Sequence, residues 1–207
     1  NTISNVSYAT YIYGKSYTTS LDTAIVDNNI ISHSNYGVYI RYAKYQHAHG
    51  NAVTYTGTSS YSGNGLYLYS SVHGVNVQNN NIVGGGGNAI YVGAGYPYGP
   101  PSGGTPLSHV IENNDINTLY TGIYLTGASS ATTTHIGYIS VKKNNINLGG
   151  TSTNYGIYLQ YVDGSSTNRS VVENNMVAMN SSSTTASARG IYLYHTGNID
   201  VFHNSVF

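Results

Sequence analysis

The chain has 207 residues, and its seven Lys or Arg balance seven Asp or Glu, so the formal net charge is zero. A neutral chain without a basic cluster does not neutralise a phosphate backbone, which argues against nucleic acid as a partner. The chain has no cysteine and no run of about 18 apolar residues, which excludes disulfides, thiolate metal sites and a transmembrane helix.

A first short element, Asn-x-(Ile/Val/Met), recurs along the whole chain. It begins at Asn1 and returns every 23 to 34 residues, at Asn28, Asn51, Asn80, Asn114, Asn144, Asn174 and Asn204. Its apolar residue is, for example, Ile30 or Met176, and another apolar residue, here Ile25 or Val171, lies five positions earlier. We expect both apolar positions to face the interior. Asn tolerates left-handed backbone angles and stacked Asn amides hydrogen-bond to one another, so the Asn column is predicted to be structural.

A second element, small-apolar-Tyr-apolar, follows each Asn element and accounts for part of an unusual content of 23 tyrosines. Its tyrosines are Tyr11, Tyr39, Tyr67, Tyr91, Tyr124, Tyr158 and Tyr192. Period-two alternation in short runs bounded by Gly and Asn predicts short β-strands, and no segment has the 3.6-residue period of a helix. Such a repeat buries its apolar face only by stacking on the next one, which predicts a parallel β-solenoid.

The repeats also resemble a known family. Ile-Glu-Asn-Asn-Asp-Ile at 111–116, Val-Lys-Lys-Asn-Asn-Ile at 141–146 and the Gly-Ile-Tyr-Leu strands are similar to right-handed parallel β-helix repeats of the pectate-lyase-like superfamily, including secreted bacterial surface proteins. The resemblance spans nearly the whole chain. It implies a right-handed, single-stranded parallel β-helix of the all-β class. The repeats themselves predict about seven coils in one domain over 1–207, and neither end shows an evident helical cap. That superfamily includes lyases, hydrolases, epimerases, phage tailspikes and adhesins, so the fold alone leaves the function open.

Catalytic residues are not visible in the pattern of acids. No two of the seven Asp or Glu fall in one column of neighbouring repeats, although cleavage of a polysaccharide would need clustered carboxylates. Instead, the spacing predicts exposed ion pairs between Glu112 and Lys142 and between Lys143 and Glu173. The closest histidines, His47 and His49, have no third ligand nearby, so neither a metal site nor a cofactor is predicted.

The tyrosines of the second element should form a stripe on the outer surface, because the residues on either side of each point inward. Tyr13, Tyr69 and Tyr194 widen this stripe at its ends. One interpretation is cross-strand packing alone. The other is that a phenol-rich face with few charges contacts sugar rings or another copy of the protein.

The segments between the repeats carry weaker signals. All four prolines fall in an insertion at 93–108, which could line a binding groove or be an incidental surface loop, and Gly84 to Gly87 predict a tight bend. Glycosylation sites are predicted at three sequons, which begin at Asn5, Asn168 and Asn180. Thr23, in Asp-Thr-Ala, resembles the O-glycan acceptor of secreted Bacteroidetes proteins.

The chain begins and ends in the same register of the repeat. We expect either a window of a longer β-helix or a protomer that stacks end to end. The function expected from these features is a non-catalytic extracellular or cell-surface protein, acting as a filament subunit, adhesin or scaffold. Its expected partner is a second copy or a polysaccharide. The alternative is a carbohydrate-active lyase, hydrolase or phage depolymerase, or a carbohydrate-binding module that does not cleave.

Overall fold

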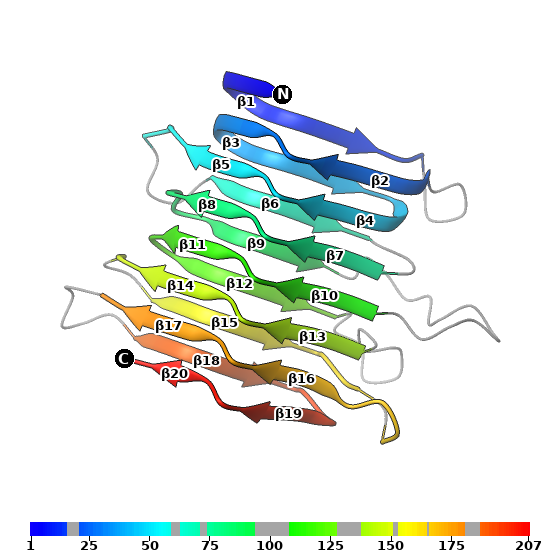
Figure 1. Cartoon of the computed structure of the whole chain (residues 1–207), viewed down its shortest axis with the longest axis vertical. Coiled ribbons are helices and arrows are strands. Elements are labelled where there is room, and N and C mark those ends of the chain that lie inside the picture. The colour runs from blue at the N-terminus through cyan, green and yellow to red at the C-terminus, as the bar shows by residue number, and fades with distance from the viewer. Residues whose placement is uncertain are drawn as a thin grey trace.

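The computed structural model describes residues 1–15, 21–58, 63–70, 74–93, 108–127, 138–150, 153–164, 166–180 and 187–207. Within these ranges the chain forms strands and no helix, and the strands pair in parallel in two sheets. Figure 1 shows the strands in stacked rows, with the N-terminus at one end of the stack and the C-terminus at the other. The predicted all-β class and parallel pairing are confirmed.

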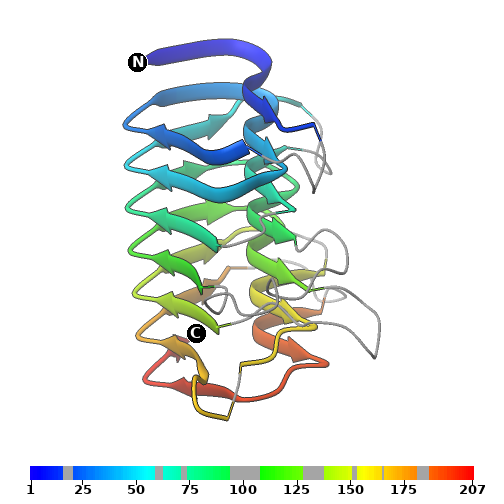
Figure 2. The ribbon, with the colours of Figure 1, turned by 90° about the vertical axis from the view of Figure 1, so that its right-hand side faces the viewer.

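The smaller sheet stacks seven strands in chain order. They are β2 (Leu21–Asp27), β4 (Ala43–His49), β7 (Gly74–Gln78), β10 (Ser108–Glu112), β13 (Tyr138–Lys142), β16 (Ser170–Glu173) and β19 (Ile199–Phe202). Each strand pairs with the equivalent strand of the next repeat, for example His109 of β10 with Ile139 of β13. The repeat therefore stacks along one axis, as Figure 2 shows from the side.

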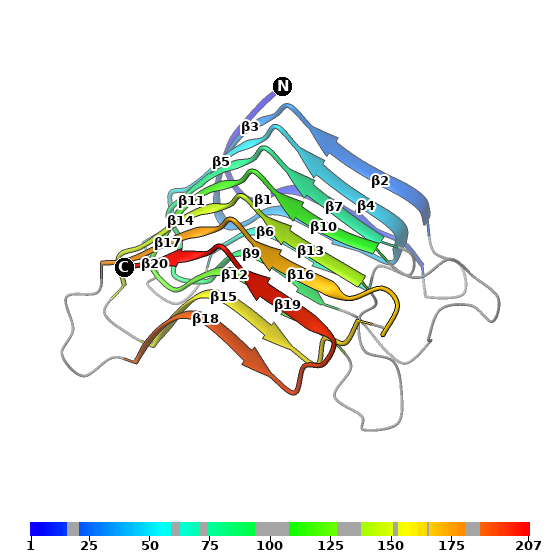
Figure 3. The ribbon, with the colours of Figure 1, turned by 60° about the horizontal axis from the view of Figure 1, so that its bottom comes forward.

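The larger sheet has two arms joined by long strands. β1 (Thr2–Tyr13) and β3 (Ile30–Arg41) each run through both arms. One arm continues with β5 (Ala52–Tyr55), β8 (Asn81–Val83), β11 (Asp115–Thr118), β14 (Asn145–Leu148), β17 (Met176–Met179) and β20 (Ser205–Val206). The other arm continues with β6 (Asn64–Tyr69), β9 (Asn88–Gly93), β12 (Thr121–Thr126), β15 (Asn154–Gln160) and β18 (Ala188–Tyr194). Figure 3 shows how the two arms and the smaller sheet surround one interior.

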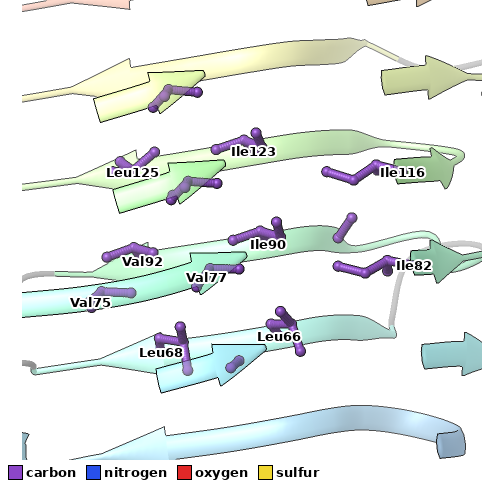
Figure 4. Close-up of a cluster of buried hydrophobic side chains, with 14 of the residues drawn as sticks. Leu66, Leu68, Val75, Val77, Ile82, Ile90, Val92, Ile116, Ile123 and Leu125 are labelled. Atoms are coloured by element: carbon purple, nitrogen blue, oxygen red, sulfur yellow. The ribbon is translucent and has the colours of Figure 1, made fainter. Parts of the chain in front are cut away.

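The interior is filled by apolar side chains that alternate with outward-facing residues. In β12, Ile123 and Leu125 are fully buried, whereas Tyr124 between them lies on the outside. Figure 4 shows Val77 and Ile82 from two different strands in the same cluster. The predicted inward pairs five residues apart are confirmed in four repeats, at 48/53, 77/82, 111/116 and 141/146. Stacking these rows removes their apolar surface from water, which is the main stabilising contribution to such a fold.

The predicted frame is wrong by one residue at Asn28 and Asn29. Ile30 is 60% exposed, and the neighbouring Ile31 is the buried residue at 1% exposure. Ile25 is likewise exposed, and Val26 is buried in its place. Asn28 has a φ of 55° and makes the bend, so the inward alternation starts one residue later than predicted.

The same correction applies near residue 174. Asn174 has a φ of 55°, Met176 is 43% exposed, and Val177 is fully buried. Val172, and not Val171, faces the interior from β16. In both repeats two apolar residues lie side by side, so the pattern Asn-x-apolar fits either frame and only the strand pairing distinguishes them.

Two histidines are buried in this interior. His109 is covered from solvent, and its register neighbours in β7 and β13 are Val75 and Ile139. Neither ring nitrogen of His109 has a hydrogen-bond partner among the described residues. Burial lowers the pKa of His109 to about 4, and it lowers the pKa of His33 to about 4 as well. Both rings are therefore neutral at pH 7.

Glycines occupy the corner between the two arms because the walls approach closely there. A Cβ on Gly122 would lie 2.6 Å from the carbonyl oxygen of Gly156 and 2.6 Å from Cγ2 of Ile146. Equivalent glycines stand at Gly37, Gly65, Gly156 and Gly190. The predicted bend at Gly84 to Gly87 is also present between β8 and β9, where Gly84 and Gly85 have positive φ values of 84° and 100°.

Substituting Gly122 by Ala should lower the free energy of unfolding by about 1–3 kcal/mol, because the added methyl group overpacks this corner. Urea unfolding measures the change. Gly149→Ala is the control, since a Cβ on the exposed Gly149 would meet only Cδ2 of Leu119, at 3.8 Å. An equal loss in both variants would contradict the close approach of the walls.

Candidate functional site

The seven tyrosines of the second element lie in one register on the outer side of the same arm. β1, β3, β6, β9, β12, β15 and β18 each supply one, and consecutive members are direct partners across the paired strands. We call Tyr11, Tyr39, Tyr67, Tyr91, Tyr124, Tyr158 and Tyr192 the tyrosine column. The structure thus brings all seven together, while their role in binding stays a prediction.

The rings of the tyrosine column stack on one another. From Tyr11 to Tyr91 successive ring centroids are 4.9, 5.2 and 4.5 Å apart, with interplanar angles of 14°, 9° and 8°. Tyr91 and Tyr124 meet edge to face at 5.4 Å. Tyr124 stacks on Tyr158 at 4.6 Å, and Tyr158 lies 5.1 Å from Tyr192. The ring faces therefore mostly cover each other, and the column offers ring edges and phenol hydroxyls to the outside.

One flank of the column lies two residues further along each strand. Tyr13, Tyr69 and Tyr194 occupy this flank, as the sequence predicted, and Arg41 lies in register between Tyr13 and Tyr69. The Arg41 guanidinium carbon is 4.9 Å from the ring centroid of Tyr69 and 4.5 Å from that of Tyr42. These are cation–π distances, so the guanidinium lies against the aromatic surface. Arg41 was not predicted from the sequence.

The other flank lies three residues before the column. It contains Tyr8 and Tyr36, whose rings stack at 5.0 Å, and further along it Tyr155 and Arg189. The Arg189 guanidinium carbon lies 4.3 Å from the ring centroid of Tyr192. Strict alternation places these residues inside the fold. They lie outside because two consecutive residues are buried at the corner, for example Gly37 and Val38 or Gly156 and Ile157, which shifts the phase of the residues before it.

The column and its flanks form one surface, which we call the tyrosine face. Its members beyond the column are Tyr8, Tyr13, Tyr36, Tyr69, Tyr155, Tyr194, Arg41 and Arg189. The seven strands that carry it contain these two arginines and no Asp or Glu. The face is therefore aromatic, rich in hydrogen-bond donors and free of carboxylates on its own strands.

Several phenols of the tyrosine column are held in their protonated form by burial. Burial raises the pKa of Tyr67 to about 12, and it also raises the pKa of Tyr158 to about 12. Burial also raises the pKa of Tyr91. The hydroxyl of Tyr124 donates to Oε1 of Gln160 at 2.5 Å. Each phenol can thus both donate and accept.

The Asn column is a continuous ladder of buried or partly buried amides. Its members are Asn29, Asn51, Asn80, Asn114, Asn144, Asn175 and Asn204. Each Nδ2 donates to Oδ1 of the next Asn at 2.9–3.1 Å, and the backbone N–H of the same residue donates to that oxygen as well. Asn1 donates to Asn29 at 3.3 Å. The predictions of Asn28 and Asn174 are wrong, because these two residues make the left-handed bend just before the ladder.

The ion pairs on the smaller sheet differ in part from the predicted ones. Lys142 pairs in register with Glu112 and places Nζ 2.7 Å from Oε1 of Glu173. Lys143 does not make the predicted pair with Glu173, because it is exposed with a φ of 54° at the left-handed bend. Glu112 accepts instead from the Ser140 hydroxyl at 2.8 Å. These groups are partly solvated and help set register at well under about 1 kcal/mol each.

No group of three His, Cys, Asp or Glu side chains that could hold a metal ion is found among the described residues. His47 and His49 both lie on β4, and Nε2 of His49 is 2.9 Å from the amide nitrogen of Asn79. In the same described ranges, no helix is long and apolar enough to cross a membrane.

The predicted glycosylation positions are all on the surface. Asn5, Thr23, Asn168 and Asn180 are exposed. Asn5 has a φ of 57° in β1, and Asn180 donates its amide to Oδ1 of Asn147 at 2.6 Å. The predicted insertion at 93–108 lies almost wholly outside the described residues.

No protein-family model, curated protein or solved structure matches this chain.

Proposed function

We propose that the chain is a right-handed parallel β-helix of about seven coils without a helical cap, in a single domain, with the architecture of the pectate-lyase-like superfamily that its repeats resemble. Equivalent strands pair in parallel one repeat apart in both sheets, which supports this architecture. The Asn ladder and the tyrosine column each recur once per repeat. Parallel crossovers between strands of one sheet are almost always right-handed, which supports the hand.

On this scaffold we propose a non-catalytic function, in which the tyrosine face holds a polysaccharide chain at the cell surface or outside the cell. The in-register tyrosine column carries this proposal. Stacked strands repeat at about 4.8 Å, and an extended pyranose chain advances by nearly the same length per sugar. One phenol hydroxyl is therefore available for each sugar along the axis.

The chemistry of the face suits binding better than cleavage. Protonated phenols donate to and accept from sugar hydroxyls, and Arg41 and Arg189 add donors for ring oxygens or uronate carboxylates. Glycosidic cleavage by an acid/base pair needs two carboxyl groups on either side of the bond, and the strands of the face have none. At one end Tyr11 is 57% exposed and offers an open ring for stacking against a sugar. The exposed glycan acceptor positions fit an extracellular location.

A polysaccharide panel with calorimetric titration tests this function. We expect one class of polysaccharide to bind, and Tyr158→Ala to weaken that binding at least tenfold, which corresponds to about 1.4 kcal/mol. The matched control is Tyr45→Ala, because Tyr45 is an exposed tyrosine of β4 on the other sheet. Circular dichroism and melting curves establish that both variants fold.

Four other results would each reject polysaccharide holding. If no polysaccharide binds, or if Tyr158→Ala leaves affinity unchanged, the tyrosine face has no such role. Cleavage of a bound polyuronate, with or without Ca²⁺, would favour the carbohydrate-active alternative. A sedimentation coefficient that rises with protein concentration, and that no longer does so in Tyr11→Ala, would assign the face to self-association, as in a filament or adhesin.

A further inference from the structure

The tyrosine column is also an unbroken series of oxidisable side chains. The chain contains no tryptophan, no cysteine and only two methionines, so phenols are its main one-electron donors. Six successive gaps between column rings measure 4.5–5.4 Å between centroids. The rate of electron transfer falls exponentially with distance, so short hops between neighbouring rings outpace one long jump across the stack.

Oxidation of a phenol also requires a place for its proton. The ring centroids of Tyr67 and Tyr91 are 4.5 Å apart with an interplanar angle of 8°, which places the phenols of two successive members side by side. Tyr124 donates to Gln160, and the hydroxyl ends of the column point away from the core. When the electron and the proton move together between two neighbouring phenols, no charge is left in the stack.

We propose that the tyrosine column is a one-electron relay, which carries an oxidising equivalent along the axis from the place where a strong one-electron oxidant acts. In the first step the oxidant, a photo-oxidised metal complex or a peroxyl radical, takes one electron from a column phenol. The phenolic proton passes to water, and a neutral tyrosyl radical remains. In each later step the neighbouring phenol gives one electron and one proton to that radical, which restores the first phenol and moves the radical by one ring.

The radical is expected to stop at the exposed rings of the tyrosine face. Tyr11 and its neighbours Tyr8 and Tyr13 are exposed at one end, and Tyr194 is exposed beside Tyr192 at the other. Burial raises the pKa of Tyr91 in the middle, so a phenol there gives up its proton least readily. A radical formed in the middle should therefore end at exposed rings. This activity needs no polysaccharide and stands apart from the proposed function.

The absence of cysteine allows one oxidant to be attached at a chosen place. Arg189→Cys carries a ruthenium polypyridyl label beside Tyr192, and flash excitation with an external electron acceptor produces Ru(III) there. We expect a transient tyrosyl radical, followed by stable oxidation products at Tyr8, Tyr11 and Tyr13, as mapped by peptide mass spectrometry. These residues lie at the far end of the column from the label.

Interrupting the column identifies the path. In the labelled chain, Tyr67→Phe with Tyr91→Phe keeps the stacked rings but removes two phenols, because phenylalanine is far harder to oxidise. We expect products at Tyr11 to fall at least tenfold, while products at Tyr158 and Tyr192 persist. Tyr45→Phe on the other sheet is the control and should change neither yield. If the double variant unfolds, Tyr91→Phe alone makes the same test.

The relay is rejected if the intact column confines products to Tyr192. It is also rejected if the interrupted column yields as much product at Tyr11 as the intact one, because the oxidant then reaches Tyr11 by diffusion. The same complex added free in solution supplies the reference pattern for diffusion.

Discussion

Replacing Asn114 by Asp should lower the free energy of unfolding at pH 7 by roughly 3–5 kcal/mol. The amide of Asn114 donates to the carbonyl of Val77 at 3.1 Å and to Oδ1 of Asn144 at 2.9 Å, and all three groups are buried. A carboxylate has the same shape but cannot donate. It would bury a charge and face two oxygens without a proton between them.

The loss should shrink in acid. Burial beside two acceptors raises the pKa of the new carboxyl above its unfolded value, and the protonated form regains one donor. The stability that the protonated carboxyl contributes is therefore fully present below the pKa of this group in the unfolded chain. It is lost as the pH rises through the pKa of the group in the folded chain. Urea unfolding at several pH values checks this. Asn113→Asp is the control, because Asn113 is exposed and has a left-handed φ of 56°. Asp tolerates this backbone conformation, so the free energy of unfolding should change by no more than about 0.5 kcal/mol.

The native chain should show the opposite pH dependence, because of its buried histidines. The folded-state pKa of His109 is about 4, against 6.5 in the unfolded chain, so the unfolded state binds more protons between these values. Stability therefore falls as the pH drops from about 6.5 towards 4, by about 3 kcal/mol for such a shift. His33 adds to the loss in the same window.

Replacing His109 by Leu should remove the part of this acid-induced loss of stability that His109 causes. Its register neighbours in β7 and β13 are Val75 and Ile139, so an apolar side chain of similar size fits between them. We expect the free energy of unfolding to rise by about 1–3 kcal/mol at pH 7, because the substitution removes two buried ring nitrogens that have no hydrogen-bond partner among the described residues. We also expect the variant to lose less stability in acid. His49→Gln at the exposed end of β4 is the control. An unchanged acid profile for His109→Leu would show that His109 does not set it.

Much of the fold could be predicted because each residue repeats its role in the next layer. Alternation around Ile123 and Leu125, and the pairing of equivalent strands, follow from the repeat alone. The frame at Asn28 and Asn174 could not be predicted from that pattern, since Ile30 and Ile31 are equally apolar. Only the position of the left-handed bend, set by the pairing of neighbouring layers, decides which of two adjacent residues turns inward.

The site was predictable to a smaller extent. The alignment of the tyrosine column follows from one position in a repeat. Its flanks do not, because the glycine corner shifts the phase that places Tyr36 and Tyr155 outside. The stacking of rings, and the arginines held against them, depend on side-chain rotamers that each layer imposes on the next. Sequence alone does not supply those angles.

The Asn ladder keeps one spacing although the chain between its members does not. Successive ladder residues are 22 residues apart between Asn29 and Asn51 and 34 apart between Asn80 and Asn114, yet their amides meet at 3.1 and 3.0 Å. The difference is taken up outside the paired strands, where doubling a loop adds only about 0.6 kcal/mol of closure entropy. Length and geometry are thus uncoupled in this molecule. Additional residues can therefore be inserted between the paired strands without altering the strand pairing or the Asn ladder.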